Sequence, residues 1–179
     1  MFRNKMGMRG LVTAKVFDAE GNVKRHEPNL FERLFNLPGK EMISVNHNIV
    51  TNEGDALFID MLVTTGTRTA MDNANAVIGV GTGFTSETKT TDALVTQTGS
   101  DEEMDATYPL QKGAWAATDD NVIVYRSTFE ASDLNDTGID EALLGNGTDT
   151  LAYAEISPTV NVTTADTLEI TWEITFLGS

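Results

Sequence analysis

Acidic and amide side chains crowd the segment 133–141 in an order similar to that of a calcium-binding loop. Asp133 and Asn135 match its first and third positions, and Gly138 matches the sixth. The twelfth position, where an EF-hand needs a bidentate glutamate, is Leu144. A second acidic group consists of Asp101, Glu102, Glu103 and Asp105. We interpret both groups as solvated loop carboxylates and assign no metal ligand, with a looser calcium site as the alternative.

Glycines alternate with other residues in the segment GVGTGF, which invites comparison with a nucleotide-binding loop. Gly79, Gly81 and Gly83 do not have the GxGxxG spacing, and no Lys followed by Ser or Thr comes after them. No clear helix begins there to hold a phosphate. The pattern favours a tight exit from a strand into a loop.

Two glutamates near the end of the chain, Glu169 and Glu173, come nearest to a catalytic pair. On an extended strand they would lie about 13 to 14 Å apart, which is beyond the roughly 5 to 9.5 Å that glycoside hydrolysis uses. His26 and His47 have no serine elbow nearby, and the chain has no cysteine. We therefore predict no catalytic residue, no cofactor and no metal site, so that the protein is not an enzyme.

The formal net charge of −15 is unevenly distributed. Residues 1–50 hold eight Lys and Arg against five Asp and Glu, whereas residues 51–179 hold four against twenty-two. Such an acidic surface repels the phosphate backbone, so a nucleic-acid partner is excluded. The acidity is interpreted as a solubility feature, and the alternative is that the basic N-terminal segment docks on the acidic body of a neighbouring copy. Because no secretory signal or apolar run of membrane-spanning length is found, we expect a soluble protein that is made in the cytoplasm and has no membrane partner.

Polar and apolar residues alternate along the last dozen positions of the chain. The apolar positions are Leu168, Ile170, Trp172, Ile174 and Phe176. A period of two is typical of a strand with one buried face, and such a strand needs a second apolar layer to cover it. The pattern predicts a mainly β fold, an antiparallel β-sandwich or jelly-roll-like body with one or two short helices and an N-terminal arm or hairpin. Residues 1–179 are predicted to form a single domain, with 1–40 as a possible arm or hairpin extension.

Further strands and one helix follow from the same kind of pattern. Strands are predicted at 11–17, 23–27, 44–50, 77–83, 121–131, 139–144 and 151–156, the first two forming a hairpin. Residues 84–120 are polar and interrupted by Gly and Pro, so they are predicted to be mainly loop. Asn52 is placed to cap a helix over 53–63. The buried stripe expected on that helix is Leu57, Phe58, Met61 and Leu62.

The segment 29–40, NLFERLFNLPGK, concentrates large apolar side chains at helical spacing. They are Leu30, Phe31, Leu34, Phe35 and Leu37, and Pro38-Gly39 ends the segment. A short helix of this kind packs on the sheet or projects as an arm. In the second case its apolar side chains would anchor it in the groove of a partner.

The order of these segments resembles that of small virion structural proteins of tailed bacteriophages. The resemblance spans residues 9–177 and rests on an N-terminal hairpin followed by four segments. They are NIVTNEGDALFIDML at 48–62, IGVGTG with the downstream TTDALV at 78–95, IDEALLGNGTDTLAYAEISP at 139–158 and DTLEITWEITF at 166–176. The resemblance implies a β-rich subunit that repeats in a virion, binds through edges and arms, and has no catalytic residues.

Within that group we expect a capsid decoration or cement protein, whose partners are copies of itself and other virion proteins such as the major capsid or tail proteins. A tail, baseplate or fibre-attachment subunit is the alternative. The predicted interface residues are Arg3, Lys5, Arg9, Leu30, Phe31, Leu34, Phe35, Leu37 and Trp115. A carbohydrate-binding module is the alternative of another class, and it would need a flat platform formed by Trp115, Tyr108 and Tyr125. Tyr125 is predicted to point inward, which leaves that platform incomplete.

Overall fold

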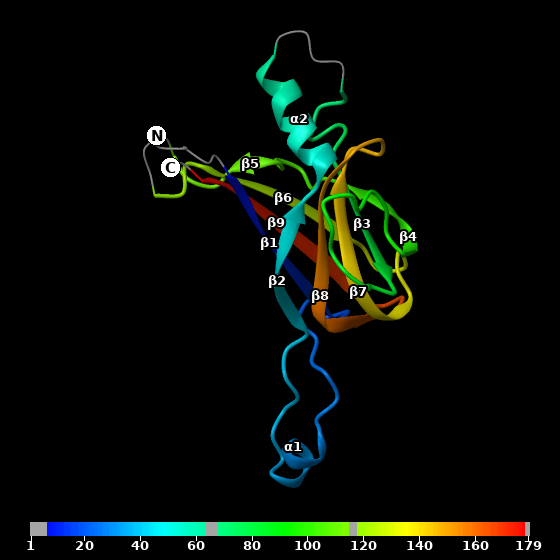
Figure 1. Cartoon of the computed structure of the whole chain (residues 1–179). Helices are drawn as coiled ribbons and strands as arrows, with labels where there is room; N and C mark the ends of the chain where they lie inside the picture. The colour runs from blue at the N-terminus through cyan, green and yellow to red at the C-terminus, as the bar shows by residue number, and fades with distance from the viewer. Residues whose placement is uncertain (1–6, 64–67, 115–117, 178–179) are drawn as a thin grey trace.

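A single curled antiparallel sheet forms the body of the protein (Figure 1). The computed structural model describes residues 7–63, 68–114 and 118–177. Within these ranges nine strands pair in the order β4-β3-β7-β8-β2-β1-β9-β6-β5. They are β1 (Gly7–Phe17), β2 (Ile43–Val50), β3 (Val77–Thr82), β4 (Thr96–Glu103), β5 (Leu110–Gln111), β6 (Val122–Phe129), β7 (Asp136–Gly145), β8 (Thr150–Val162) and β9 (Thr167–Leu177). The predicted mainly β class is confirmed.

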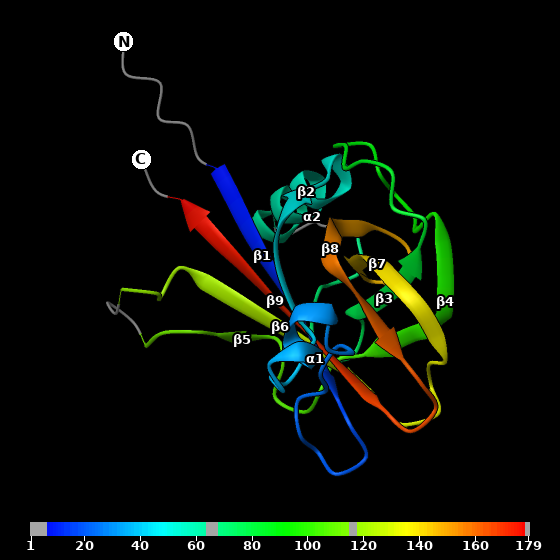
Figure 2. The ribbon, with the colours of Figure 1, turned by 90° about the horizontal axis from the view of Figure 1, so that it is seen from below.

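The sheet curls until its two halves face each other (Figure 2). Just beyond β4, the backbone N–H of Asp105 donates to the carbonyl of Arg126 in β6 at 2.8 Å. The Ser127 hydroxyl donates to the carbonyl of Glu102 at 3.3 Å. One continuous sheet therefore supplies both of the apolar layers that the alternating pattern predicts, and the core fills the space between them.

The longest ladder of this sheet joins β1 to β9. All eleven residues of β1 pair with β9 in a single register, from Gly7 opposite Leu177 to Phe17 opposite Thr167. β9 also pairs with β6 along its other side. The expected alternation is confirmed, because Leu168, Ile170, Trp172 and Ile174 are buried and Phe176 is partly buried against the same core.

The glycines of β3 let β4 lie close against it. A Cβ atom on Gly79 would come within 2.5 Å of the Asp101 carboxylate, and one on Gly81 would come within 2.4 Å of the Thr96 carbonyl. Gly83 has a φ of +93°, which takes the chain out of the strand. The sequence did not predict β4, because this exposed edge strand is polar on both faces.

The helix α2 (Asn52–Leu62) stands at one end of the sheet (Figure 1). Its N-cap is Thr51, not the predicted Asn52, since the Thr51 hydroxyl accepts the N–H of Gly54 at 2.9 Å. Leu57 is buried as predicted, but Met61 is 61% exposed. The predicted stripe is therefore only partly covered, because the helix projects beyond the strands.

A buried carboxylate fastens the start of β4 to the middle of the sheet. Glu141 in β7 has no exposed surface. It accepts the N–H of Val95 at 2.9 Å, the N–H of Thr96 at 3.0 Å and the hydroxyl of Tyr153. Burial and the adjacent Glu141 raise the pKa of Tyr153, so its hydroxyl stays protonated as a donor. These bonds give both oxygens of the buried carboxylate a partner.

Replacing Glu141 with alanine is expected to lower the free energy of unfolding by about 3 kcal/mol or more, because two N–H groups and a hydroxyl lose their acceptor. Tyr153→Phe removes one donor and is expected to cost about 1.5 kcal/mol. Urea unfolding measures both changes. The control, Glu20→Ala in an exposed turn, is expected to stay within about 0.5 kcal/mol of the wild type. An unchanged unfolding midpoint for Glu141→Ala would contradict this role of the carboxylate.

Candidate interaction surfaces

The segment between β1 and β2 leaves the sheet as a long arm (Figure 1). The predicted hairpin strand at 23–27 is not part of the sheet. Only isolated bridges form there, between Phe17 and Val23 and between Arg25 and Glu41. Further out, the N–H of His26 donates to the carbonyl of Lys40 at 2.9 Å. The two sides of the arm thus hold each other, which gives the arm a defined path away from the body.

A short helix, α1 (Leu30–Leu34), forms the tip of the arm. Asn29 and Glu32 form a capping box, in which the Asn29 side chain accepts the Glu32 N–H at 2.9 Å and the Glu32 carboxylate accepts the Asn29 N–H at 2.8 Å. The Phe31 and Phe35 ring centroids are 4.6 Å apart. Local contacts therefore preorganise the tip without support from the body.

The five apolar side chains of the tip lie in solvent, with exposed fractions from 47% to 85%. They are Leu30, Phe31, Leu34, Phe35 and Leu37. Of the two arrangements open to this segment, packing on the sheet is wrong and projection as an arm is confirmed. Five large apolar side chains gathered on one exposed tip are typical of a binding surface.

The base of the arm is fixed by a salt bridge between the Lys24 ammonium and the Asp166 carboxylate. The Asp166 carboxylate also accepts the N–H and hydroxyl of Thr163, at 2.7 and 2.6 Å. Burial alone would raise the pKa of Asp166, but the hydrogen bonds from Lys24 and Thr163 outweigh it and lower this pKa. The ionised carboxylate thus stabilises the junction between arm and sheet.

The predicted basic residues lie only partly within the described chain. Arg3, Lys5 and Trp115 fall outside the described residues, so their predicted interface role stays a prediction. Arg9 is exposed in β1. Together with Arg33 and Lys40, it makes no ion pair with any described residue. The unpaired cations of the described ranges thus lie in the N-terminal segment, two of them on the arm.

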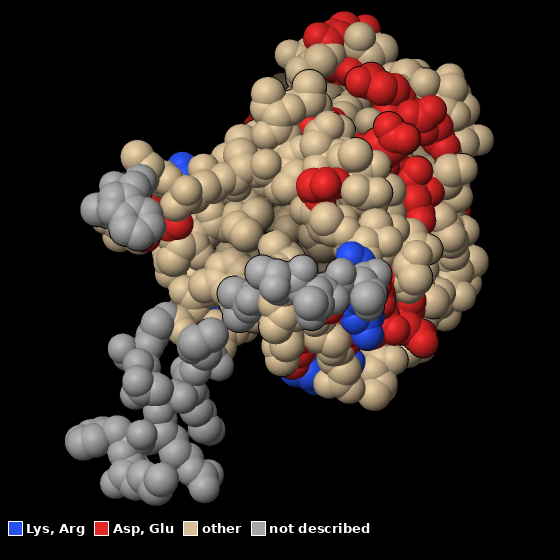
Figure 3. Space-filling model, turned by 90° about the horizontal axis from the view of Figure 1, so that it is seen from above, with Lys and Arg blue, Asp and Glu red and all other residues tan. Residues whose placement is uncertain are grey.

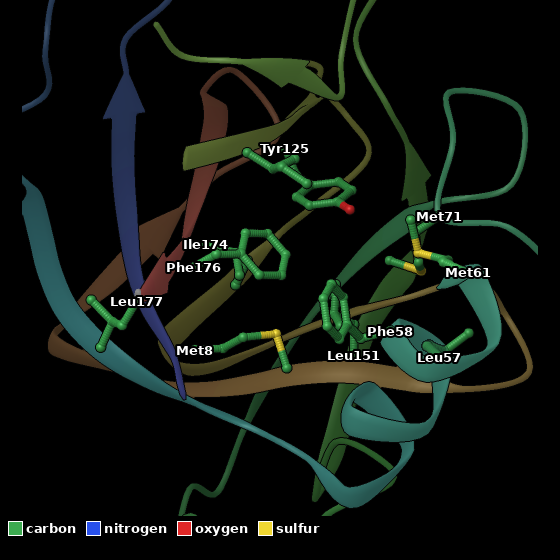
Figure 4. A pocket seen from close by; sticks show the side chains of 11 residues that line it. Met8, Leu57, Phe58, Met61, Met71, Tyr125, Leu151, Ile174, Phe176 and Leu177 are labelled. Atoms are coloured by element: carbon green, nitrogen blue, oxygen red, sulfur yellow. The ribbon is translucent and has the colours of Figure 1, made fainter. Parts of the chain in front are cut away.

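An apolar pocket opens at the other end of the body, between α2 and the paired ends of β1 and β9 (Figure 4). Its volume is about 440 Å³, which is room for roughly 15 water molecules at liquid density. The lining residues are Met8, Leu57, Phe58, Met61, Met71, Ile123, Tyr125, Leu151, Ile174, Phe176 and Leu177. Seen from this end, the hollow is surrounded largely by uncharged atoms (Figure 3). A surface so depleted of polar groups is typical of a binding site.

Phe58 and Phe176 continue this surface into a second hollow of about 680 Å³. Their ring centroids are 5.0 Å apart, and both residues line both hollows. Ile59 and Ile49 extend the apolar lining on the far side, where the Asp55–Lys89 ion pair marks a polar border. We call the two hollows together the α2 groove.

Tyr125 brings a polar group to the α2 groove. Its side chain is only 4% exposed, and burial raises its pKa to about 12. Figure 4 shows its hydroxyl pointing into the pocket. Within the described ranges this hydroxyl makes no hydrogen bond with protein. It is therefore available to an occupant of the pocket.

Sequence reasoning did not find the α2 groove, although its residues carried a signal. Phe58 and Met61 were assigned to the core, and the groove exists because α2 leaves them partly uncovered.

The predicted inward direction of Tyr125 is confirmed. The Arg126 guanidinium covers the Tyr108 ring, and the distance from its central carbon, Cζ, to the centroid of that ring is 4.4 Å. Neither ring presents the flat, open face that a sugar platform needs.

The acidic groups form no cation site in the described ranges, where no three acidic or histidine side chains lie close enough to hold a metal ion. Burial and the carboxylates of Asp133 and Glu103 raise the pKa of Glu102.

The helices of the described chain are too short to cross a membrane. Comparison of the sequence with protein-family models and curated proteins, and of the fold with solved structures, gives no match.

Acid is expected to weaken the junction between arm and sheet. Because the pKa of Asp166 is lowered on folding from its ordinary value near 4, its contribution is complete above that value and is lost as the pH falls through the folded pKa. The difference in unfolding free energy between the wild type and Asp166→Asn should therefore be largest near neutral pH and shrink below about pH 4. Lys24→Met should move this loss to higher pH. Urea unfolding from pH 2 to 7 tests both, and parallel curves for wild type and Asp166→Asn would contradict the prediction.

Proposed function

We propose that this chain is a non-enzymatic structural subunit of a tailed-phage virion, most specifically a capsid decoration or cement protein that binds a protein lattice and copies of itself. The observation that carries the proposal is the arm, a preorganised projection with five exposed apolar side chains at its tip. A free-standing apolar tip of this size is costly in water and is useful only when a partner covers it.

The body supports the same proposal, because it separates a rigid scaffold from its contact surfaces. The buried core joins both sides of the curled sheet. The arm projects from one end of this body, and the α2 groove opens at the other end (Figure 1). An acidic outer surface keeps such a subunit soluble before assembly. A tail, baseplate or fibre-attachment subunit is the second candidate, favoured by the placement of two apolar surfaces at opposite ends, which suits a ring.

The proposal is tested by locating the chain in particles. Virions released from cells that carry the gene are purified on a density gradient, and gold-conjugated antibody against the purified chain is applied. We expect the chain to co-purify with the particles and the gold to decorate the heads. Gold confined to the tail would replace the decoration role with the tail role. A chain that is abundant in the lysate but missing from the particles by mass spectrometry would overturn both.

A further inference from the structure

We propose that the arm tip of one copy occupies the α2 groove of a second copy, so that the protein associates head to tail. This inference rests on the proposed structural function and names the partner of the arm. Both surfaces are apolar, and the described residues of the chain leave each of them uncovered. A body that carries both a projecting apolar tip and an open apolar groove has complementary surfaces for another copy of itself.

The geometry excludes insertion of the arm into the groove of its own chain. β1 runs from Gly7 and Met8, beside the pocket, to Phe17 at the root of the arm. Eleven extended residues span about 33 Å, and the arm points further away from α2 (Figure 1). An arm can therefore reach only the groove of another molecule. Such a contact joins unlike surfaces, so repetition gives a ring or a filament.

The size of the tip suits a stable contact. A large apolar side chain has an accessible surface of about 150 Å² or more. With the exposed fractions given above, the exposed surface of the five tip residues amounts to on the order of 500 Å². This is more than half of the roughly 800 Å² that each partner buries in a standard interface. Contacts along the arm and around the rim of the groove can supply the remainder.

Polar groups of the two surfaces also match. The pocket presents the Tyr125 hydroxyl, which points into it and makes no hydrogen bond with a described residue. At the end of α1, the carbonyls of Leu34 and Phe35 accept no hydrogen bond in the described ranges. A hydroxyl that can donate thus meets a helix end that can accept.

Charge on the arm is limited to a few residues. Arg33 on the tip is exposed and makes no ion pair in the described ranges. Carboxylates gather on the body along one side of the hollow (Figure 3), and residues 51–179 hold twenty-two Asp and Glu against four Lys and Arg. The arm as a whole is close to neutral, since residues 18–42 hold four Lys and Arg against five Asp and Glu. The contact is therefore expected to depend on apolar burial and to be little affected by salt.

Two single variants of the full chain separate the surfaces. Leu34→Glu places a charge on the tip, and Met61→Glu places one on the groove; because these side chains are 77% and 61% exposed, both variants should fold. Val45→Glu, at a 54% exposed position outside both surfaces, is the matched control. Sedimentation equilibrium should give self-association for wild type and control, and a dissociation constant at least tenfold higher for each of the other two.

Mixing the two defective variants distinguishes head-to-tail contact from arm-to-arm contact. The intact arm of Met61→Glu can enter the intact groove of Leu34→Glu, so the mixture should form a 1:1 complex that grows no further. Cross-linking provides a second measurement, because the chain has no cysteine of its own. A short bismaleimide should join Leu34→Cys to Met61→Cys in a mixture, and should not join Leu34→Cys to itself.

Three outcomes would overturn this inference. They are an unchanged dissociation constant for Met61→Glu, a Leu34→Cys homodimer as the main cross-linked product, and a monomeric wild type over the whole concentration range. In the last two cases the proposed function survives if the chain is still found on particles, since the arm would then bind another copy's arm or a different virion protein. Absence from particles combined with a confirmed head-to-tail complex would instead reject the virion role and keep the self-association.

Discussion

The ladder between β1 and β9 is the constraint on which the remaining structure depends. It pairs eleven residues from the two ends of the described chain in a single register. β9 presents Trp172 and its apolar neighbours to the core and also holds β6. One end of this ladder carries the arm, and the other end contributes Met8 and Phe176 to the pocket. The separation of the two candidate surfaces is therefore set by the length of one strand pair, and the rigidity of that pair keeps them apart.

A buried carboxylate and a partly buried salt bridge complete this scaffold. Glu141 fastens the start of β4 to the middle of the sheet by accepting the backbone N–H groups of Val95 and Thr96. Asp166, through Lys24, ties the root of the arm to the turn before β9. In both places a carboxylate fastens a segment at the margin of the strand ladders. The root of the arm is therefore held on the sheet, while the tip projects into solvent.

Much of the fold was predictable because a strand with one buried face has apolar and polar residues in alternation, and this alternation is visible in the sequence. The pattern predicted β9, β6, β7 and β8, and it placed α2 to within one residue at each end. β4 was missed because an edge strand in solvent has no apolar face to reveal it. The N-cap was assigned one residue late, because Thr51 and Asn52 are both good capping residues and only the helix start decides between them.

The sequence by itself determined the β class, the alternation of the core strands, the charge asymmetry and the apolar character of residues 30–37. Only the tertiary structure decided which apolar residues are covered. Leu57 and Met61 lie on the same helix, line the same pocket and have the same apolar character, yet Leu57 is 2% exposed and Met61 is 61% exposed. Local sequence records hydrophobicity, whereas burial depends on whether a distant segment arrives to exclude water. That is why the arm remained one of two alternatives, and why the α2 groove appeared only when the strands were in place.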